Sequence, residues 1–115
     1  MANPKLLIED LVNLPDGPRV LRLTGPLTLT TVPEFQSKVH GDQSHNLILD
    51  FTHVPYVDSI GMGTLVDVNV RHRRDGNSVS LVGASDRLRS VLKLARVDRF
   101  FRFFDSLADA QAKLD

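Results

Sequence analysis

Cysteine and tryptophan are absent from this sequence, and tyrosine occurs once. Without cysteine the chain can form no disulfide, no thiolate zinc site and no cysteine nucleophile, so its stability rests on packing. Net charge is absent as well, because 14 basic residues balance 14 acidic ones. A neutral chain has no overall field that would draw it onto nucleic acid or an anionic membrane, so we expect a specific partner instead.

Long apolar stretches are also missing. No run approaches the roughly 20 apolar residues of a membrane span, and residues 1–10 lack the apolar core of a signal peptide. We therefore expect no membrane insertion and a cytoplasmic protein. The 115 residues are 42% hydrophobic and 24% charged, which fits one globular domain over residues 1–115.

The order of strand and helix patterns predicts an α/β fold. Two apolar runs flank a Pro-Asp-Gly-Pro turn at residues 15–18, which indicates an antiparallel pair. The run Leu47-Ile48-Leu49 does not alternate, as is typical of a central strand buried on both faces. We expect strands at residues 6–12, 19–24, around 47–49, 78–82 and 101–103, and helices at 31–41, 59–74, 85–95 and 107–114. This order, β-β-α-β-α-β-α-β-α, predicts a mixed, mostly parallel sheet of about five strands with about four helices.

Two of the predicted helices have recognisable starts. Thr31 and Glu34 have the spacing of a capping box, and Val32, Phe35 and Val39 form the apolar stripe of that helix. Ser85 can cap the third helix.

In the second helix, one face should pack on the sheet and the other should meet solvent. The predicted core face comprises Met62, Leu65, Val66, Asn69 and Val70. Ile60, Thr64 and Val68 then lie on the outer face. An exposed Ile60 and Val68 would form an apolar patch, which suits a partner interface, although scattered surface aliphatics are common.

The hydroxyl of Ser59 stands where the central strand gives way to the second helix. A helix start has unpartnered backbone N–H groups and the positive end of the helix dipole, so it favours an anion such as a phosphoryl group. The simplest interpretation is that Asp58 or Ser59 is an N-cap. Ligands of open α/β sheets also gather at such junctions. Gly61 and Gly63 weaken the helix, which makes sense if another backbone must approach closely.

Other functions find weaker support in the sequence. The elbow of serine hydrolases needs a glycine two positions before the serine, where this chain has Val57. A small serine-dependent enzyme stays an alternative, with one of the four histidines as base.

His40 and His45 lack the spacing of a metal site. The basic run at residues 71–74 complements the dipole at a helix end. No glycine-rich phosphate loop is present, so we expect no cofactor. Since the histidine spacing and the incomplete elbow give no support either, we also expect no metal and no catalytic residue.

Several segments together resemble one family, the STAS domains of anti-sigma factor antagonists. The run NLILDF at residues 46–51, followed by VDSIGMGTL at 57–65, looks like the family signature. LRLTGPL at 21–27 is similar to its second strand and glycine turn, LVG at 81–83 to a later strand, and residues 88–104 to a helix that ends in a short aromatic strand.

The resemblance implies a function and a site. In the family, the serine at the position of Ser59 is phosphorylated by a partner that is both anti-sigma factor and ATP-dependent serine kinase. The unphosphorylated antagonist sequesters that kinase and frees the sigma factor, and a serine phosphatase resets the switch. Asp58 would orient the hydroxyl, Gly61 and Gly63 would permit docking, and phosphate would release the partner. The expected partner-binding residues are Asp58, Ile60, Gly61, Gly63, Thr64 and Val68.

The chain departs from the family at two positions. Thr28 stands in the Gly25 turn where members commonly carry an acidic residue, and Ile60 stands where prominent members carry Ser or Thr. Ser59 is then the sole hydroxyl within residues 58–63. The alternative is a STAS scaffold for a sensory or transporter complex without a working phospho-switch. The sequence leaves open whether the domain forms a homodimer.

Overall fold

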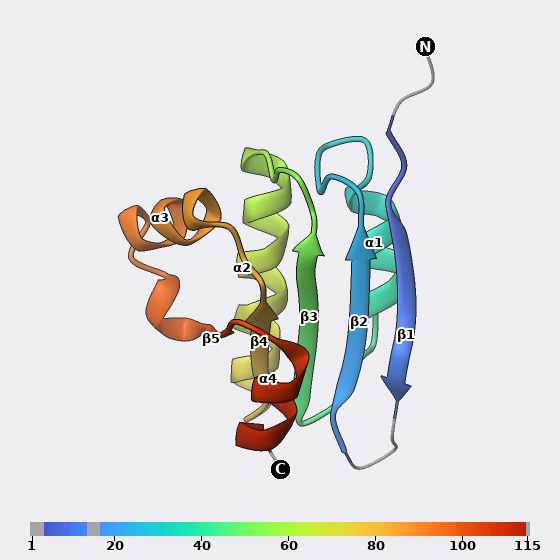
Figure 1. Cartoon of the computed structure of the whole chain (residues 1–115), viewed down its shortest axis with the longest axis vertical. Helices are drawn as coiled ribbons and strands as arrows, with labels where there is room; N and C mark the ends of the chain where they lie inside the picture. The colour runs from blue at the N-terminus through green and yellow to red at the C-terminus, as the bar shows by residue number, and fades with distance from the viewer. Residues whose placement is uncertain (1–3, 14–16, 115) are drawn as a thin grey trace.

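A twisted sheet with helices on both faces forms the body of the protein (Figure 1). The computed structural model describes residues 4–13 and 17–114. Within them the strands are β1 (Leu7–Asn13), β2 (Arg19–Thr24), β3 (Asn46–His53), β4 (Ser78–Val82) and β5 (Arg102–Phe104). The helices are α1 (Val32–Val39), α2 (Ser59–Arg74), α3 (Asp86–Leu94), α4 (Leu107–Leu114) and the short 3-10 helix η1 (Asp98–Phe100).

The predicted topology is confirmed. The strands lie in the order β1-β2-β3-β4-β5, with β1 antiparallel to β2 and every later neighbour parallel. β3 is central, as its continuous apolar run predicts. The turn predicted at residues 15–18 falls partly on Pro15 and Asp16, which lie outside the described residues.

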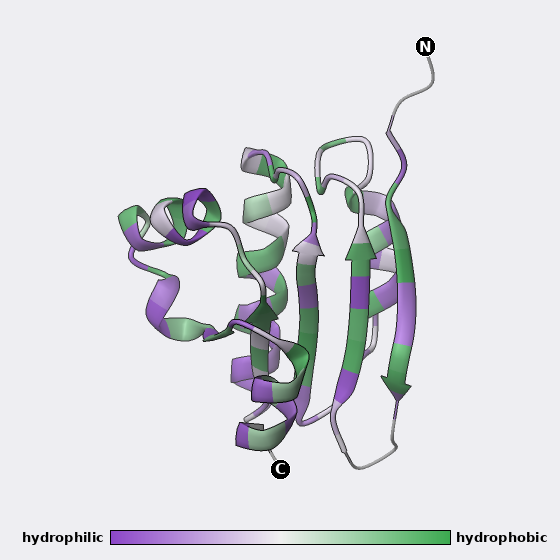
Figure 2. Ribbon diagram, viewed as in Figure 1, coloured by the Kyte–Doolittle hydropathy of each residue, from purple (hydrophilic) through white to green (hydrophobic). Residues whose placement is uncertain are grey.

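Two apolar layers hold the sheet between its helices. The larger one contains Phe35 of α1, Leu49 of β3, Leu65 of α2 and Leu92 of α3, all fully buried. A smaller one, beneath α4, joins Ile48 to Ala110 on the opposite face. Figure 2 shows mainly hydrophobic residues along β2 and β3, whereas α3 and η1 carry many hydrophilic ones. None of the helices in the described part of the chain combines the length and the apolarity needed to cross a bilayer.

Two local predictions are wrong. The Thr31 hydroxyl makes no capping bond to α1; it donates to the carbonyl of Pro26 at 2.8 Å and accepts from the N–H of Thr28 at 2.9 Å, so it holds the preceding loop. In α2, Val70 is 43% exposed and Val68 only 6% exposed, the reverse of the predicted faces. The reason is that α2 packs against α1 as well as against the sheet, which turns its buried face toward α1.

The loop before α1 is joined to the loop before α2, and this joint positions the start of α2. Gly25 N–H donates to the carbonyl of His53, Leu27 pairs with Val57 in a parallel bridge, and the carbonyl of Leu27 accepts from Asp58 N–H at 3.2 Å. At Gly61 an added Cβ would lie 2.2 Å from the same carbonyl oxygen. Only a residue without a side chain lets α2 begin so close to Leu27.

A buried ionic cluster ties the other end of α2 to the sheet. The ring of His72 is 6% exposed; its Nε2 lies 2.9 Å from Asp42 Oδ2 and its Nδ1 lies 3.0 Å from the carbonyl of Val68. Arg19 and Ser44 also donate to the Asp42 carboxylate, at 3.2 and 2.7 Å. Since both ring nitrogens face oxygen acceptors, the protonated imidazolium satisfies both.

The pKa values of this cluster move in opposite directions. The hydrogen bond to Asp42 raises the pKa of His72 above its ordinary 6.5, although burial opposes the change. Burial alone would raise the pKa of Asp42, but hydrogen bonds from His72, Ser44 and Arg19 lower it to about 2.

The cluster predicts how stability depends on pH. Protonated His72 stabilises the fold fully below pH 6.5, its ordinary pKa, and this contribution is lost as the pH rises through the raised folded pKa. Ionised Asp42 stabilises the fold above pH 3.8 and less as the pH falls toward 2. Urea unfolding should give the largest free energy between these limits. His72→Gln should lower that free energy by about 1–3 kcal/mol and flatten the alkaline side of the profile. Exposed His53→Gln is the control; a His72→Gln profile parallel to the wild-type profile would contradict the assignment.

The surroundings of the two glycines of α2 predict that substitution by alanine has opposite effects on stability at the two positions. Gly61→Ala should reduce the free energy of unfolding by about 2–3 kcal/mol, because the new Cβ must displace the backbone of Leu27. Gly63 has no atom within 4 Å of an added Cβ, so Gly63→Ala should increase stability by about 1 kcal/mol through helix propensity. Chemical denaturation of both variants measures the contrast. Equal effects of the two substitutions would mean that the contact with Leu27 does not constrain the helix start.

Candidate functional site

Ser59 is the first residue of α2 and is exposed. It follows β3 through the short loop at residues 54–58, at the edge where parallel strands β2, β3 and β4 end. This edge is where open α/β sheets bind their ligands. The hydroxyl is therefore accessible to a protein that approaches the start of α2.

Asp58 is the N-cap of α2 and also holds the neighbouring loop. Its Oδ1 accepts from the N–H of Gly61 at 2.8 Å, and its Oδ2 accepts from the N–H of Leu29 at 3.0 Å. These backbone hydrogen bonds, first that of Gly61 and then that of Leu29, lower the pKa of the Asp58 carboxyl. Both oxygens are thus engaged with backbone groups. Asp58 fixes the position of Ser59 through the helix start, rather than through contact with its hydroxyl.

A groove opens beside Ser59, between the start of α2 and α3. Its volume is about 610 Å³. Residues of two segments far apart in the sequence line it, namely Pro55, Tyr56, Val57, Asp58, Ser59 and Met62 of the first, and Ser85, Arg87, Leu88 and Val91 of the second. Its walls are mainly apolar, and its polar groups are Asp58, Arg87 and the hydroxyls of Ser59, Ser85 and Tyr56. The groove has the composition of a surface that receives an apolar side chain of another protein.

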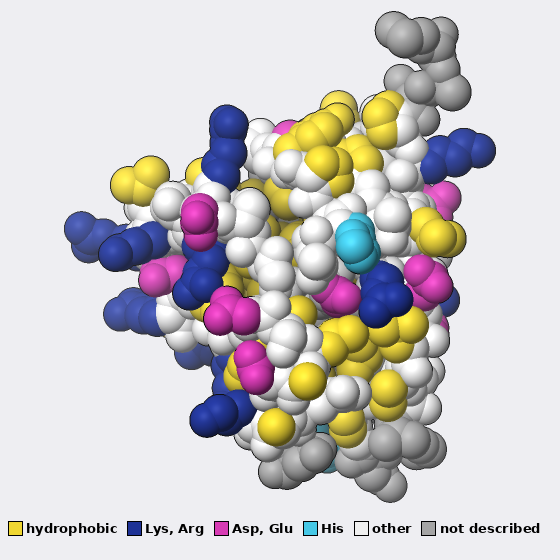
Figure 3. All heavy atoms as spheres, viewed as in Figure 1, with side chains coloured by type: hydrophobic (Ala, Val, Ile, Leu, Met, Phe, Trp, Pro, Cys, Tyr) yellow, Lys and Arg dark blue, Asp and Glu magenta, His cyan; other side chains and the backbone are white. Residues whose placement is uncertain are grey.

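Exposed apolar side chains lie at the same end of the molecule as Ser59. Leu29 is 65% exposed, Tyr56 53% and Ile60 47%. Leu29 belongs to the loop that Asp58 holds, so it lies at the same end of the molecule as Tyr56 and Ile60. Figure 3 shows hydrophobic side chains gathered at this end, at the top of the view. The predicted exposure of Ile60 is confirmed, and we call Leu29, Tyr56, Ser59 and Ile60 the switch surface.

Three of the predicted partner-binding residues are buried. Thr64 is 8% exposed and Val68 6%, so the prediction that they lie on an outer face is wrong. The Thr64 hydroxyl donates to the carbonyl of Ile60 at 2.9 Å within α2. Gly61 is buried beneath Leu27, so its lack of a side chain serves the fold. Gly63, by contrast, is exposed and has open space around it.

Sequence reasoning missed Leu29, Tyr56 and Arg87 at this site. Leu29 and Arg87 are distant from Ser59 in sequence and meet it only through the joint of the two loops and the packing of α3. Nothing in the local sequence marks them, apart from Leu29 being an isolated apolar residue in a threonine-rich loop.

A serine-dependent enzyme would need a base beside the Ser59 hydroxyl. His72 lies 13 positions along α2 from Ser59, which places it about 20 Å away by the rise of a helix. Its ring is engaged with Asp42 and Val68. Among residues 4–13 and 17–114, no hydrogen bond joins Ser59 to a histidine, and no group of three or more potential ligand side chains gathers to hold a metal ion.

Solved structures of other proteins share this fold. The anti-sigma factor antagonist from Mycobacterium paratuberculosis is 22% identical, with a TM-score of 0.75 over 97% of this chain and 94% of that chain. The Bacillus cell fate determinant SpoIIAA in its phosphorylated form is 17% identical, with a TM-score of 0.75 over 96% and 99%. A sulfate transporter family protein from Wolinella succinogenes is 24% identical, with a TM-score of 0.74 over 90% and 88%.

At these identities the likeness shows a common fold. The match to a family model is more specific, because it rests on the sequence of nearly the whole chain. The model of the STAS domain matches residues 11–110, and the chain therefore belongs to the STAS domain family.

Proposed function

We propose that this protein is a non-enzymatic anti-sigma factor antagonist that binds an anti-sigma factor serine kinase and is switched off by phosphorylation of Ser59. The observation that supports the proposal most directly is the exposure of Ser59 at the start of α2, beside a mainly apolar groove and next to exposed Ile60. Two of the solved structures of similar fold are an anti-sigma factor antagonist and a phosphorylated SpoIIAA.

The unmodified switch surface suits a protein partner. Leu29, Tyr56 and Ile60 supply apolar area that gains free energy when a partner removes it from water. The neighbouring groove can admit one anchoring side chain of that partner. The position of Ser59 between these features means that any partner that covers them also covers the hydroxyl.

A phosphate on Ser59 would change this surface without disturbing the fold. It adds roughly −1.5 to −2 charges, which must be desolvated when an apolar interface closes over them. The start of α2 tolerates the added charge, because the helix dipole and the first-turn N–H groups favour an anion. Partner binding therefore weakens while the protein stays folded. The nucleotide and the catalytic groups belong to the kinase, and a serine phosphatase restores the hydroxyl.

A second candidate function is a STAS scaffold in a sensory or transporter complex, without a working switch. The similarity to a sulfate transporter family protein favours it. In that case the switch surface binds its partner constitutively, and Ser59 serves only as the first residue of α2.

A kinase assay distinguishes the two candidates. We expect incubation with the anti-sigma factor kinase of the same organism and Mg-ATP to place one phosphate on the chain, mapped to Ser59 by mass spectrometry. Ser59→Ala should incorporate none. Ser106→Ala is the matched control, because Ser106 caps α4 on the opposite face of the sheet, and it should be phosphorylated like the wild type. Binding of the kinase without phosphorylation of wild type would favour the scaffold.

A phosphomimetic variant tests the effect of charge on binding. Ser59→Asp should unfold at the same denaturant concentration as wild type or higher, since an acidic residue at a helix start is favourable. Its affinity for the kinase, measured by calorimetry, should fall at least tenfold, because a charge now lies in the apolar interface. Ser106→Asp adds the same charge at another helix start and should leave the affinity unchanged. Full affinity of a folded Ser59→Asp would contradict the switch.

A further inference from the structure

The zero net charge of the chain conceals a strong separation of charge. Nine of the 14 basic residues fall between residues 71 and 102, a stretch with three acidic residues, whereas the rest of the chain has five basic and 11 acidic residues. Figure 3 shows Lys and Arg side chains along the flank that α3, η1 and β5 form. We call this flank, with the end of α2, the basic flank. Its basic residues are Arg73, Arg74, Arg87, Arg89, Lys93, Arg96, Arg99 and Arg102. Arg71 lies on the other side of α2, in a pocket with Gln36 and Asp42.

These cations are exposed and mostly lack neutralising partners. All nine basic residues between residues 71 and 102 are exposed, and within the described part of the chain only Arg71, which lies outside the flank, has a carboxylate within ion-pair distance, that of Asp67 at 3.2 Å. Three of the five basic residues outside residues 71–102 do have such partners. Arg19, Arg22 and Lys38 each pair with an aspartate. Of the acidic residues near α3, Asp86 and Asp98 share a shallow pocket with Arg89 and Lys93, and neither carboxylate comes within ion-pair distance of these cations.

Phenylalanine rings hold several guanidinium groups flat against the flank. Arg73 and Arg99 lie over the ring of Phe100, with guanidinium carbons 3.9 and 5.1 Å from its centroid. Arg89 lies 4.7 Å from the centroid of Phe103. A guanidinium that stacks on a ring keeps its N–H groups free, and its planar fork matches the oxygens of a phosphate. The stacking therefore orients donors toward phosphate groups at low entropic cost.

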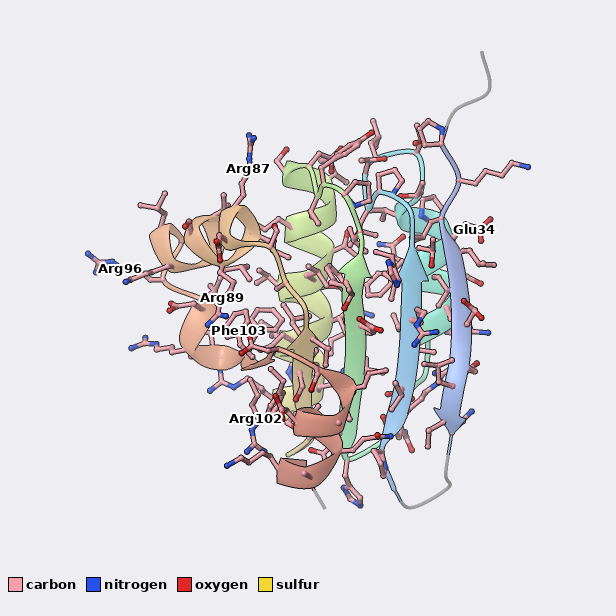
Figure 4. All side chains as sticks on the ribbon, viewed as in Figure 1. Glu34, Arg87, Arg89, Arg96, Arg102 and Phe103 are labelled. Carbon is pink, nitrogen blue, oxygen red and sulfur yellow. The ribbon has the colours of Figure 1, made fainter. Side chains whose placement is uncertain are left out.

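Leu94, at the end of α3, is the most exposed of the large apolar side chains that the structure describes, at 84%. Lys93 and Arg96 flank it in sequence, and Arg96 has a left-handed backbone with φ of 61°, which turns the chain sharply after the helix. Figure 4 shows Arg87 pointing up from α3 and Arg96, just after that helix, pointing to the left, away from the sheet, and Figure 1 shows α3 projecting from the body. An apolar side chain thus protrudes among cations.

We infer that the basic flank docks the protein onto an anionic phospholipid surface, with α3 foremost. Cations without carboxylate partners attract the phosphates of such a surface, and a protruding leucine can enter its apolar layer. Nucleic acid would gain nothing from an exposed Leu94. An acidic protein would have to offer a concave face to this projecting helix, whereas a bilayer needs no preformed cavity. The contact is peripheral and involves no insertion of a helix across the membrane.

Vesicle co-sedimentation of the full chain tests this inference. We expect the protein to sediment with vesicles of phosphatidylcholine that contain phosphatidylglycerol, and not with vesicles of phosphatidylcholine alone. Raising the salt concentration to about 0.5 M should release it, because screening weakens charge attraction over a few ångströms. The triple variant Arg87→Gln, Lys93→Gln and Arg96→Asn should bind on the order of a hundredfold more weakly. Asparagine suits the left-handed backbone at Arg96, so the turn is retained.

A matched variant controls for the loss of charge. Lys5→Gln, Lys38→Gln and Lys113→Gln also remove three positive charges, but from outside the basic flank. This control should bind within about threefold of the wild type. Leu94→Ser, which keeps every charge, should weaken binding about tenfold, as expected for losing part of the burial of one leucine. Ser59→Ala should have no effect, since the flank acts independently of the proposed switch.

Three outcomes would overturn the inference. One is an absence of sedimentation with the anionic vesicles at low salt. Another is an equal loss of binding in the two triple variants, which would show that total charge, and not the flank, is responsible. The third is binding to duplex DNA or to polyglutamate that is as tight as binding to the vesicles and that Leu94→Ser leaves unchanged. That result would assign the flank to a polyanion other than lipid.

Discussion

The close contact between the start of α2 and the carbonyl of Leu27 is the constraint on which the site depends. Gly61 allows the contact, and the carboxylate of Asp58 secures it from both sides by accepting from Gly61 and from Leu29. Two loops that are about 30 residues apart in sequence thereby become one rigid surface. The Asp58 carboxylate accepts from backbone N–H groups, so these hydrogen bonds depend on Asp58 and on the absence of a side chain at Gly61, but not on the side chain of Leu29.

In the proposed switch, this constraint would let a single hydroxyl control a whole interface. The backbone of Ser59 is held in place, because Ser59 is the first residue of α2 and lies between the N-cap Asp58 and the first turn. The apolar groups around it come from both loops and from α3. The proposed modification at Ser59 would therefore act on a surface that is already formed, and its effect would be electrostatic. The fold need not change for affinity to change.

The charged side chains of this protein have different roles in different places. The buried cluster of Arg19, Asp42 and His72 fixes the far end of α2 to the sheet, where low exposure strengthens each interaction. The eight cations of the basic flank, in contrast, are exposed and have no carboxylate within ion-pair distance among the residues that the structure describes. A net charge of zero is thus compatible with two sets of charged side chains. One set is paired and stabilises the fold, and the other is unpaired and available to a partner. The proposed switch and the proposed lipid contact occupy different surfaces that meet at α3.

The sequence by itself determined the order of the elements, the central position of β3, the cap at Ser85 and the candidate Ser59, because these depend on local periodicity and on helix and turn chemistry. Only the tertiary structure decided which face of α2 is buried, since α1 covers Thr64 and Val68 from a side that no periodicity reveals. It also decided that Gly61 serves the contact with Leu27, that Thr31 holds a loop, and that His72 pairs with Asp42. The physical reason is common to all of these: each depends on a group that is distant in sequence or outside the element, and local patterns carry no information about such neighbours.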